Sequence, residues 1–187
     1  GFFYLAIFVF CFALFCLYFF RNPRRYSNAD TNSLLSPADG KIVDISEVNE
    51  QEFFGCKVNR IAIFMSPADV HVNRAPCPGR IKSMKRVDGK FAMAFGKNAE
   101  IKNEKNYILI ENGGERVLVV QIAGFLARRI IPYVKVDQRV DRGQAVGMIA
   151  FGSRVDIYFH KEYEPVVSLH SRVKAGNTIL ARKKEVQ

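Results

Sequence analysis

The sequence has no Cys-x-x-Cys motif, and its four cysteines and three histidines show no spacing typical of a metal site. Cys11 and Cys16 lie within an apolar N-terminal segment, where a thiol packs as a small hydrophobic group. Cys56 and Cys77 are isolated, and a cytoplasmic domain would keep both thiols reduced. The cysteines therefore predict neither a metal centre nor a disulfide framework.

Helical periodicity is weak after residue 25, and the chain has neither an internal repeat nor a low-complexity tract. Short apolar runs alternate instead with Gly, Pro and Asn turn signals, and Asn112-Gly113-Gly114 is a strong hairpin signal. The expected strands are residues 41–48, 58–65, 80–87, 107–111, 116–123, 130–136, 145–150 and 155–159. This pattern predicts a mainly β fold, a compact β barrel or sandwich. Residues 134–144 resemble the hammerhead turn of biotinyl/lipoyl-like domains, which are built from duplicated β hairpins.

Charge is absent from residues 1–20, and no strong helix breaker follows Gly1. A helix of that length spans about 30 Å, the thickness of the hydrocarbon core of a bilayer. A transmembrane helix is therefore expected. The alternative, a signal peptide, is disfavoured by the length of the run and by the lack of a small-residue cleavage site after it. Because the chain begins with Gly, we expect an upstream segment, and a second helix there would make the anchor a hairpin.

Arg21, Arg24 and Arg25 follow the apolar segment directly, and this favours the cytoplasmic side of a membrane. Near the surface each is expected to attract anionic lipid head groups by about 1 kcal/mol. The predicted organisation is a transmembrane helix at 1–20, a basic juxtamembrane linker at 21–33 and a folded domain at 34–187.

The net charge is +10, from 28 Lys and Arg against 18 Asp and Glu. Nucleic acid is one class of partner for such a basic chain. The anchor and the spread of basic residues favour a lipid surface instead; those residues include Arg128, Arg129, Arg182, Lys183 and Lys184. Ordinary solvated surface explains part of the charge in either case. We therefore expect a phospholipid partner and no nucleic acid.

Five segments in chain order resemble one family: FFRNPRR (19–25), SPADGKI (36–42), MSPADVHVNRAP (65–76), QIAGFLARRI (121–130) and FGSRVDIYF (151–159). Each alone is a weak signal, but together they cover nearly the whole chain. They resemble phosphatidylserine decarboxylase in its short, membrane-anchored form. That family makes a pyruvoyl group from its own backbone by cutting a Gly-Ser bond. The resemblance places the cut at Gly152–Ser153, which would give a β chain of residues 1–152 and an α chain of residues 153–187.

The local sequence suits this chemistry. Gly152 and Ser153 stand at the mouth of a strand pattern, where glycine is unusual. Glycine leaves the carbonyl open to attack and tolerates a strained backbone. Attack by the Ser153 hydroxyl would turn the amide into an ester. β-Elimination would then free the Gly152 carboxylate and leave a dehydroalanine, and hydrolysis of that residue by water, with release of ammonia, would leave a pyruvoyl group on residue 153.

The resemblance implies that this pyruvoyl group forms a Schiff base with the amine of phosphatidylserine, so that CO2 is lost and phosphatidylethanolamine is released. The ketone serves as the electron sink, so the family requires neither pyridoxal phosphate nor a metal. An unperturbed serine is a poor nucleophile, and the cleavage therefore also needs a base and a stabiliser for the oxyanion.

His71 and Asp39 are the implied helpers. His71 matches the family histidine linked to decarboxylation, and its ordinary pKa suits proton transfer near neutrality; a structural histidine is the alternative. Asp39 matches the aspartate linked to self-cleavage, although Asp-Gly is also a common turn pair. Longer bacterial members carry a second histidine three residues after the first, where this chain has Arg74. The base for Ser153 is left open between His71, Asp39 and a bound water.

Arg74 and Arg154 are weaker candidates for substrate binding. The planar guanidinium of Arg74 suits a carboxylate or a phosphate, with a surface or structural salt bridge as the alternative. Longer members have Leu-Gly-Ser-Thr at the cleavage site, where this chain has Phe151 and Arg154 as the flanking residues. Arg154 adds a charge beside the predicted pyruvoyl group and is expected to influence the choice of head group.

We therefore expect a self-processing phosphatidylserine decarboxylase on the cytoplasmic face of the cell (inner) membrane. Its expected partners are the phospholipid and its own two chains, with a homo-oligomer left open. One alternative is the same chemistry on another serine-headed lipid, such as archaetidylserine. The other is a non-catalytic, membrane-tethered β domain that binds lipid, and it predicts one intact polypeptide instead of two chains.

Overall fold

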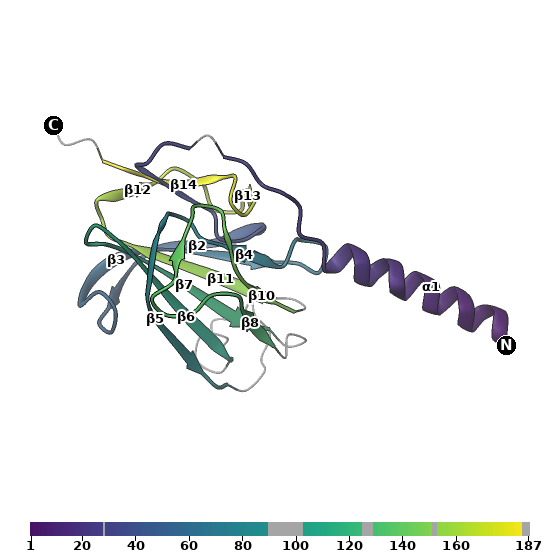
Figure 1. Cartoon of the computed structure of the whole chain (residues 1–187). Helices are drawn as coiled ribbons and strands as arrows, with labels where there is room; N and C mark the ends of the chain where they lie inside the picture. Colours follow the sequence, from purple (N-terminus) through teal and green to yellow (C-terminus); the bar gives the residue numbers. More distant parts are fainter. Residues whose placement is uncertain (28, 90–102, 125–128, 151–152, 185–187) are drawn as a thin grey trace.

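The computed structural model describes residues 1–27, 29–89, 103–124, 129–150 and 153–184. An N-terminal helix, α1 (Phe2–Phe19), projects from a β domain (Figure 1). α1 is long and apolar enough to cross a membrane, and nearly all its side chains are exposed except Phe19 at its end. The predicted N-terminal apolar helix is confirmed.

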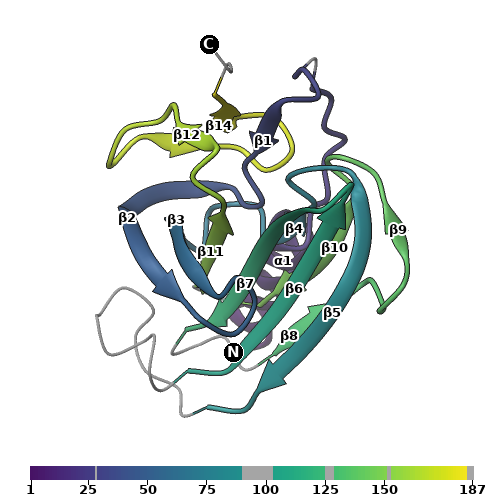
Figure 2. The same ribbon diagram turned by 90° about the vertical axis from the view of Figure 1, so that its left-hand side faces the viewer.

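The β domain contains one large and two small sheets. In chain order the strands are β1 (Ser33–Leu35), β2 (Gly40–Glu50), β3 (Cys56–Met65), β4 (Val72–Arg74), β5 (Gly79–Val87), β6 (Lys105–Asn112), β7 (Glu115–Ala123), β8 (Ile130–Pro132), β9 (Arg139–Val140), β10 (Ala145–Ile149), β11 (Ser153–Phe159), β12 (Tyr163–Pro165), β13 (Arg172–Val173) and β14 (Ile179–Lys183). The large sheet has the order β13-β2-β3-β11-β7-β6-β5-β9, and the small ones β1-β14-β12 and β4-β10-β8. Figure 2 shows the large sheet curled, with β1, β12 and β14 across one end. The mainly β, barrel-like fold is confirmed.

The predicted strands coincide with the long strands of the structure, and the turn at Asn112–Gly114 joins β6 to β7 as expected. Gly113 and Gly114 both have positive φ, which glycine adopts without strain. The strand predicted at 130–136 is shorter in the structure, where β8 ends at Pro132. Apart from β8, strands of two or three residues, such as β4, were not predicted, since they are too short to show an alternating pattern. The five-residue β14 was also missed.

β11 is the central strand of the domain, paired with β3 on one side and β7 on the other. Its first residue, Ser153, lies opposite Met65 and Ala123. Val155 and its alternate neighbours point into the main hydrophobic core. The other face of β11 is also buried, so its polar residues must pair with one another. β11 therefore places residue 153 inside the protein, at the edge of the core.

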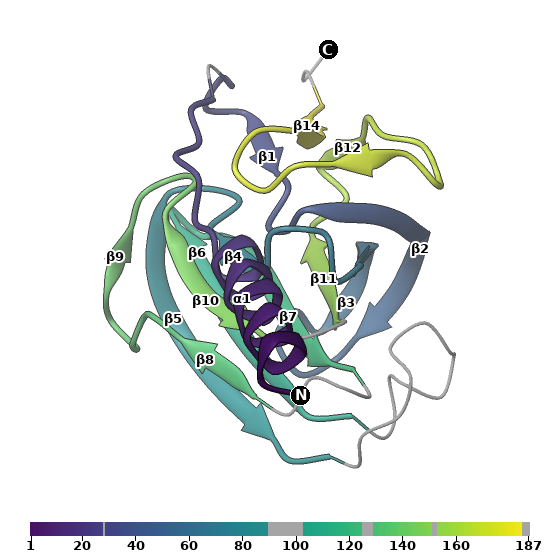
Figure 3. The ribbon, with the colours of Figure 1, turned by 90° about the vertical axis from the view of Figure 1, so that its right-hand side faces the viewer.

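The end of α1 is fixed to the loop that follows β3. The Tyr18 hydroxyl donates a hydrogen bond to the Ala68 carbonyl at 3.0 Å, and Arg21 donates to the same oxygen at 2.8 Å. The Arg21 guanidinium also lies 3.8 Å from the centre of the Tyr18 ring, a cation–π contact. Figure 3, which looks along α1, shows that the helix projects from the end of the domain near β4 and β10. α1 and the β domain thus meet at one defined place.

Candidate active site

Ser153 is fully buried at the start of β11. Its hydroxyl donates to the Met65 sulfur at 3.4 Å, and a thioether is only a weak acceptor. The hydroxyl is therefore held less firmly than it would be by a carboxylate or a carbonyl. Gly152, the other half of the predicted cleavage site, lies outside the described residues.

His71 is fully buried in the segment between β3 and β4. Its Nδ1 lies 2.9 Å from the Asp69 carbonyl oxygen, and because a carbonyl can only accept, Nδ1 carries the proton. Nε2 then presents a lone pair, and within the described part of the chain it has no hydrogen-bond partner. Burial lowers the pKa of His71 and outweighs the opposing effect of Asp69. The imidazole is therefore a neutral base near pH 7.

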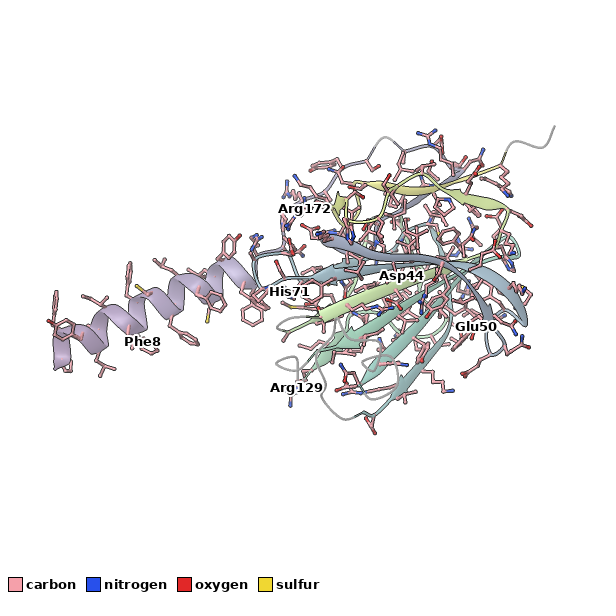
Figure 4. All side chains as sticks on the ribbon, turned by 180° about the vertical axis from the view of Figure 1, so that it is seen from behind. Phe8, Asp44, Glu50, His71, Arg129 and Arg172 are labelled. Atoms are coloured by element: carbon pink, nitrogen blue, oxygen red, sulfur yellow. The ribbon has the colours of Figure 1, made fainter. Side chains whose placement is uncertain are left out.

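The ring of Phe19 covers the His71 imidazole. The two ring centroids are 4.3 Å apart with an angle of 31° between the planes, and both side chains are fully buried. Figure 4 places His71 at the end of the domain that carries α1, where β11 also begins. The last turn of α1 thus forms one wall of the histidine site.

We expect Phe19→Ala to raise the pKa of His71, because water would reach the imidazole and relieve the desolvation that now disfavours its charged form. An NMR titration of the His71 ring in detergent micelles measures this. Phe12→Ala removes a similar ring from an exposed position in the same helix and is the control. If both variants titrate like the wild type, Phe19 does not set the environment of His71.

Asp69 orders the loop that carries His71, a role that the sequence reasoning missed. Its carboxylate accepts hydrogen bonds from the Ser66 backbone N–H at 2.8 Å and from the Ser66 hydroxyl at 2.7 Å. The other oxygen accepts from Arg172 at 2.5 Å. The Ser-x-x-Asp spacing in the segment at 65–76 is the signal that could have revealed this local turn.

Asp39 lies in the turn before β2. One carboxylate oxygen accepts from the Ala175 backbone N–H and the other from Arg25, both at 2.7 Å. Burial raises the pKa of Asp39, and the bonds to Ala175 and Arg25 partly offset that rise. Gly40, the next residue, allows the start of β2 to lie close to β3, because a Cβ there would lie 2.2 Å from the Phe64 carbonyl oxygen. The hydrogen bonds of Asp39 thus join the segment after α1 to the turn before β14.

Arg74 ties the segment after α1 to the domain. Its guanidinium donates to the Gly143 carbonyl at 2.8 Å, to the Asn22 side-chain oxygen at 2.5 Å and to the Pro23 carbonyl at 2.9 Å. It also lines a polar pocket of about 260 Å³ with Arg24 and Arg25. Arg74 is therefore engaged with the protein and borders a basic cavity at the foot of α1.

Arg154 faces away from the Ser153 side chain, as alternation along a strand requires. Its guanidinium makes a two-pronged bond to the Asp156 carboxylate, at 2.6 and 2.8 Å, and both residues are buried. An internal ion pair therefore stands where the sequence had suggested a charge beside the pyruvoyl group. The predicted influence of Arg154 on the choice of lipid head group stays a prediction.

The residues around Ser153 have room for a pyruvoyl group, because the group would be made from the serine itself and contains fewer non-hydrogen atoms in its side chain. The unpartnered Nε2 of His71 is a further buried polar atom suited to proton transfer. Within the described ranges, no group of three or more His, Cys, Asp and Glu side chains could hold a metal. The fully buried amides Asn73 and Gln121 were also missed by the sequence reasoning, although both lie in quoted segments.

Comparison with known proteins agrees with the resemblance noted in the sequence. The family model described as phosphatidylserine decarboxylase matches residues 12–181. The phosphatidylserine decarboxylase proenzyme of Carboxydothermus hydrogenoformans is 46% identical over 181 residues, covering 96% of this chain and 85% of that protein. The proenzyme of Syntrophotalea carbinolica is 45% identical over 89% of this chain and 78% of that protein. The proenzyme of Pelagibacter ubique is 45% identical over 89% of this chain and 79% of that protein. The chain therefore belongs to the phosphatidylserine decarboxylase family.

Proposed function

We propose that this chain is a self-processing phosphatidylserine decarboxylase whose catalytic group is made from Ser153. Family membership, with relatives named as proenzymes, supports the reaction and a processed precursor. The observation that carries the site assignment is the buried Ser153 hydroxyl on a weak sulfur acceptor, at the end of the domain where the His71 Nε2 atom has no partner among the described residues. A buried serine hydroxyl on so weak an acceptor is a poor choice for a structural residue, but it suits attack on the preceding carbonyl.

A pyruvoyl group at residue 153 would supply a ketone that withdraws electrons from the bound amino acid head group. The chain's own residues help to keep this position dry: Met65 and Ala123, which lie opposite Ser153 on the neighbouring strands, are both fully buried. Exclusion of water strengthens every charge interaction at the site and protects a reactive carbonyl. The burial of Ser153 is thus useful both before and after processing.

We assign both proton transfers to His71. Its Nε2 lone pair can accept the Ser153 hydroxyl proton, and the same nitrogen can later deliver a proton to the substrate carbon. Asp39 is a poorer base for Ser153, because both its oxygens already accept hydrogen bonds from other groups. We assign Asp39 a positioning role, in which it holds Ala175 of the α chain and Arg25 of the β chain.

After cleavage the two chains should stay together. The α chain would contribute β11, β12, β13 and β14, and β11 is paired along its whole length on both sides. We therefore expect native mass spectrometry to give one species that contains both chains, at 21.2 kDa or a multiple of it, and denaturing mass spectrometry to give two separate chains. Release of the small chain under native conditions would contradict this arrangement.

We place the domain on the cytoplasmic face of the cell membrane, with α1 as its anchor. The basic segment after α1 supports that side. Arg129 and Arg172 also lie toward the α1 end of the domain in Figure 4, where they would meet anionic head groups. Arg74 and the basic cavity at the foot of α1 are our candidates for contact with the lipid phosphate.

The test is release of CO2 from carboxyl-labelled phosphatidylserine in mixed micelles containing the purified chain. We expect release together with formation of phosphatidylethanolamine. A serine-headed lipid with a different glycerol backbone, assayed in parallel, decides between lipid substrates. A chain that carries a carbonyl at residue 153 and releases no CO2 from either lipid would overturn the proposed reaction.

A further inference from the structure

Three buried amide side chains form a hydrogen-bonded relay across the interior. Asn106 on β6 donates from Nδ2 to Oε1 of Gln121 on β7, at 2.8 Å. Gln121 then donates from Nε2 to Oδ1 of Asn73 on β4, at 2.7 Å. Asn73 and Gln121 are fully buried, and Asn106 is nearly so. Buried amides are costly unless they are paired, so this relay calls for an explanation beyond packing.

The relay fixes which way each amide points. An amide has one oxygen that accepts and one nitrogen that donates. Because the oxygen of Asn73 is committed to Gln121, its NH2 group must point the other way. There it approaches the Met65 sulfur at 3.6 Å. The direction of the whole relay thus delivers an N–H donor to Met65.

Met65 is also the partner of Ser153. The same sulfur accepts the Ser153 hydroxyl at 3.4 Å, so two good donors share one weak acceptor. A methionine side chain is flexible and adopts new rotamers readily. With Met65 turned aside, the Asn73 N–H group and the Ser153 hydroxyl, which share this sulfur, would be left to bond to each other, and the hydroxyl oxygen is a far better acceptor than sulfur.

The backbone around the relay leaves room for it. Gly147 on β10 lies opposite Asn73 on β4. A Cβ at residue 147 would come within 2.9 Å of the Gln121 Nε2 atom and within 2.9 Å of the Ile131 carbonyl oxygen. Any larger residue there would displace the amide that orients Asn73.

We propose that Asn73, held in orientation by Gln121, is the hydrogen-bond donor to the reacting oxygen at residue 153. The inference rests on the proposed function and adds a catalytic residue to it. In the precursor the Asn73 N–H group donates a hydrogen bond to a lone pair of the Ser153 oxygen and so orients the hydroxyl. The hydroxyl proton is then free to move to a base. Gln121 is a positioning residue that acts through Asn73.

The first test is the rate of self-cleavage of Asn73→Leu, followed by intact mass after cell-free synthesis of the whole chain. We expect cleavage to slow by about 100-fold, the typical effect of removing one such donor. Asn59→Leu is the matched control, because Asn59 donates one comparable hydrogen bond to the Tyr163 carbonyl at 2.9 Å, at the far end of β11. If Asn73→Leu melts like Asn59→Leu and cleaves at the wild-type rate, the inference is wrong.

The second test is Asn73→Asp, which separates donation from packing and decides the matter if Asn73→Leu does not fold. A buried carboxyl keeps the shape of the amide but has a hydrogen to donate only when protonated. We expect its cleavage rate, divided by the wild-type rate at the same pH, to rise as the pH falls. A ratio that does not change with pH overturns the inference. A wild-type chain that never cleaves overturns the proposed function itself, whereas a cleaving wild type with unaffected Asn73 variants overturns the inference alone.

Discussion

Ser153→Ala should remain a single chain and release no CO2 from phosphatidylserine. The methyl group is almost the same size as the hydroxymethyl group, so the fully buried position still packs and the fold survives. What is lost is the oxygen that would form the ester, and within the proposed mechanism no other atom replaces it. Denaturing mass spectrometry and a CO2-release assay on the same sample measure the two losses together.

Ser153→Cys is the matched control, since it keeps a nucleophile at the same place with little change in volume. We expect this variant to cleave more slowly than the wild type, and to cleave more than Ser153→Ala. Normal turnover by Ser153→Ala would end the assignment of residue 153 as the source of the catalytic group.

His71→Gln should slow both self-cleavage and decarboxylation. General acid–base catalysis by a positioned side chain contributes about 10²–10⁴-fold to a rate. Glutamine keeps a polar group in the buried space, but it has no nitrogen that can take up and return a proton near neutrality. The self-cleavage rate is followed by intact mass, and the decarboxylation rate is divided by the amount of processed chain.

His170→Asn is the control, because His170 is exposed and has a positive φ that asparagine also tolerates. If His71→Gln cleaves at the wild-type rate and only decarboxylation slows, another group activates Ser153. If both rates stay near those of the wild type, His71 has neither role.

The lowered pKa of His71 also predicts a pH dependence. A histidine whose pKa falls on folding binds fewer protons in the folded state, so it costs stability only below its unfolded pKa of about 6.5. The free energy of unfolding should therefore fall as the pH drops below that value, and less steeply in His71→Gln. Urea titrations across this range measure the difference.

The fold class followed from the sequence because the long strands are bounded by clear turn signals, as at Asn112–Gly114. The strand at 155–159 was predicted because Val155, Ile157 and Phe159 alternate with more polar residues, a pattern that is common in strands with one face in solvent. In the structure both faces of β11 are buried, and Arg154 is paired with Asp156 inside the protein. Which side of a strand faces solvent depends on what packs over it, and a single sequence does not give that.

The candidate site was predictable only where one residue carries the chemistry. Ser153 and His71 stand out by type and by neighbouring sequence. The Asn73–Gln121 pair joins residues 48 positions apart, and the contact of Phe19 with His71 joins the anchor to the loop after β3. Polar residues in apolar strands are the only local sign of such pairs. Their partners are set by how β4 and β7 come together in space.

The most direct measurement is the intact mass of the freshly purified, folded protein before and after treatment with an amine and borohydride. If Ser153 becomes a pyruvoyl group, the sample contains two chains, and only the chain that starts at residue 153 gains the mass of the reduced amine adduct. A single unbroken chain that melts cooperatively and takes up no amine would contradict the proposal that this protein makes its own carbonyl group.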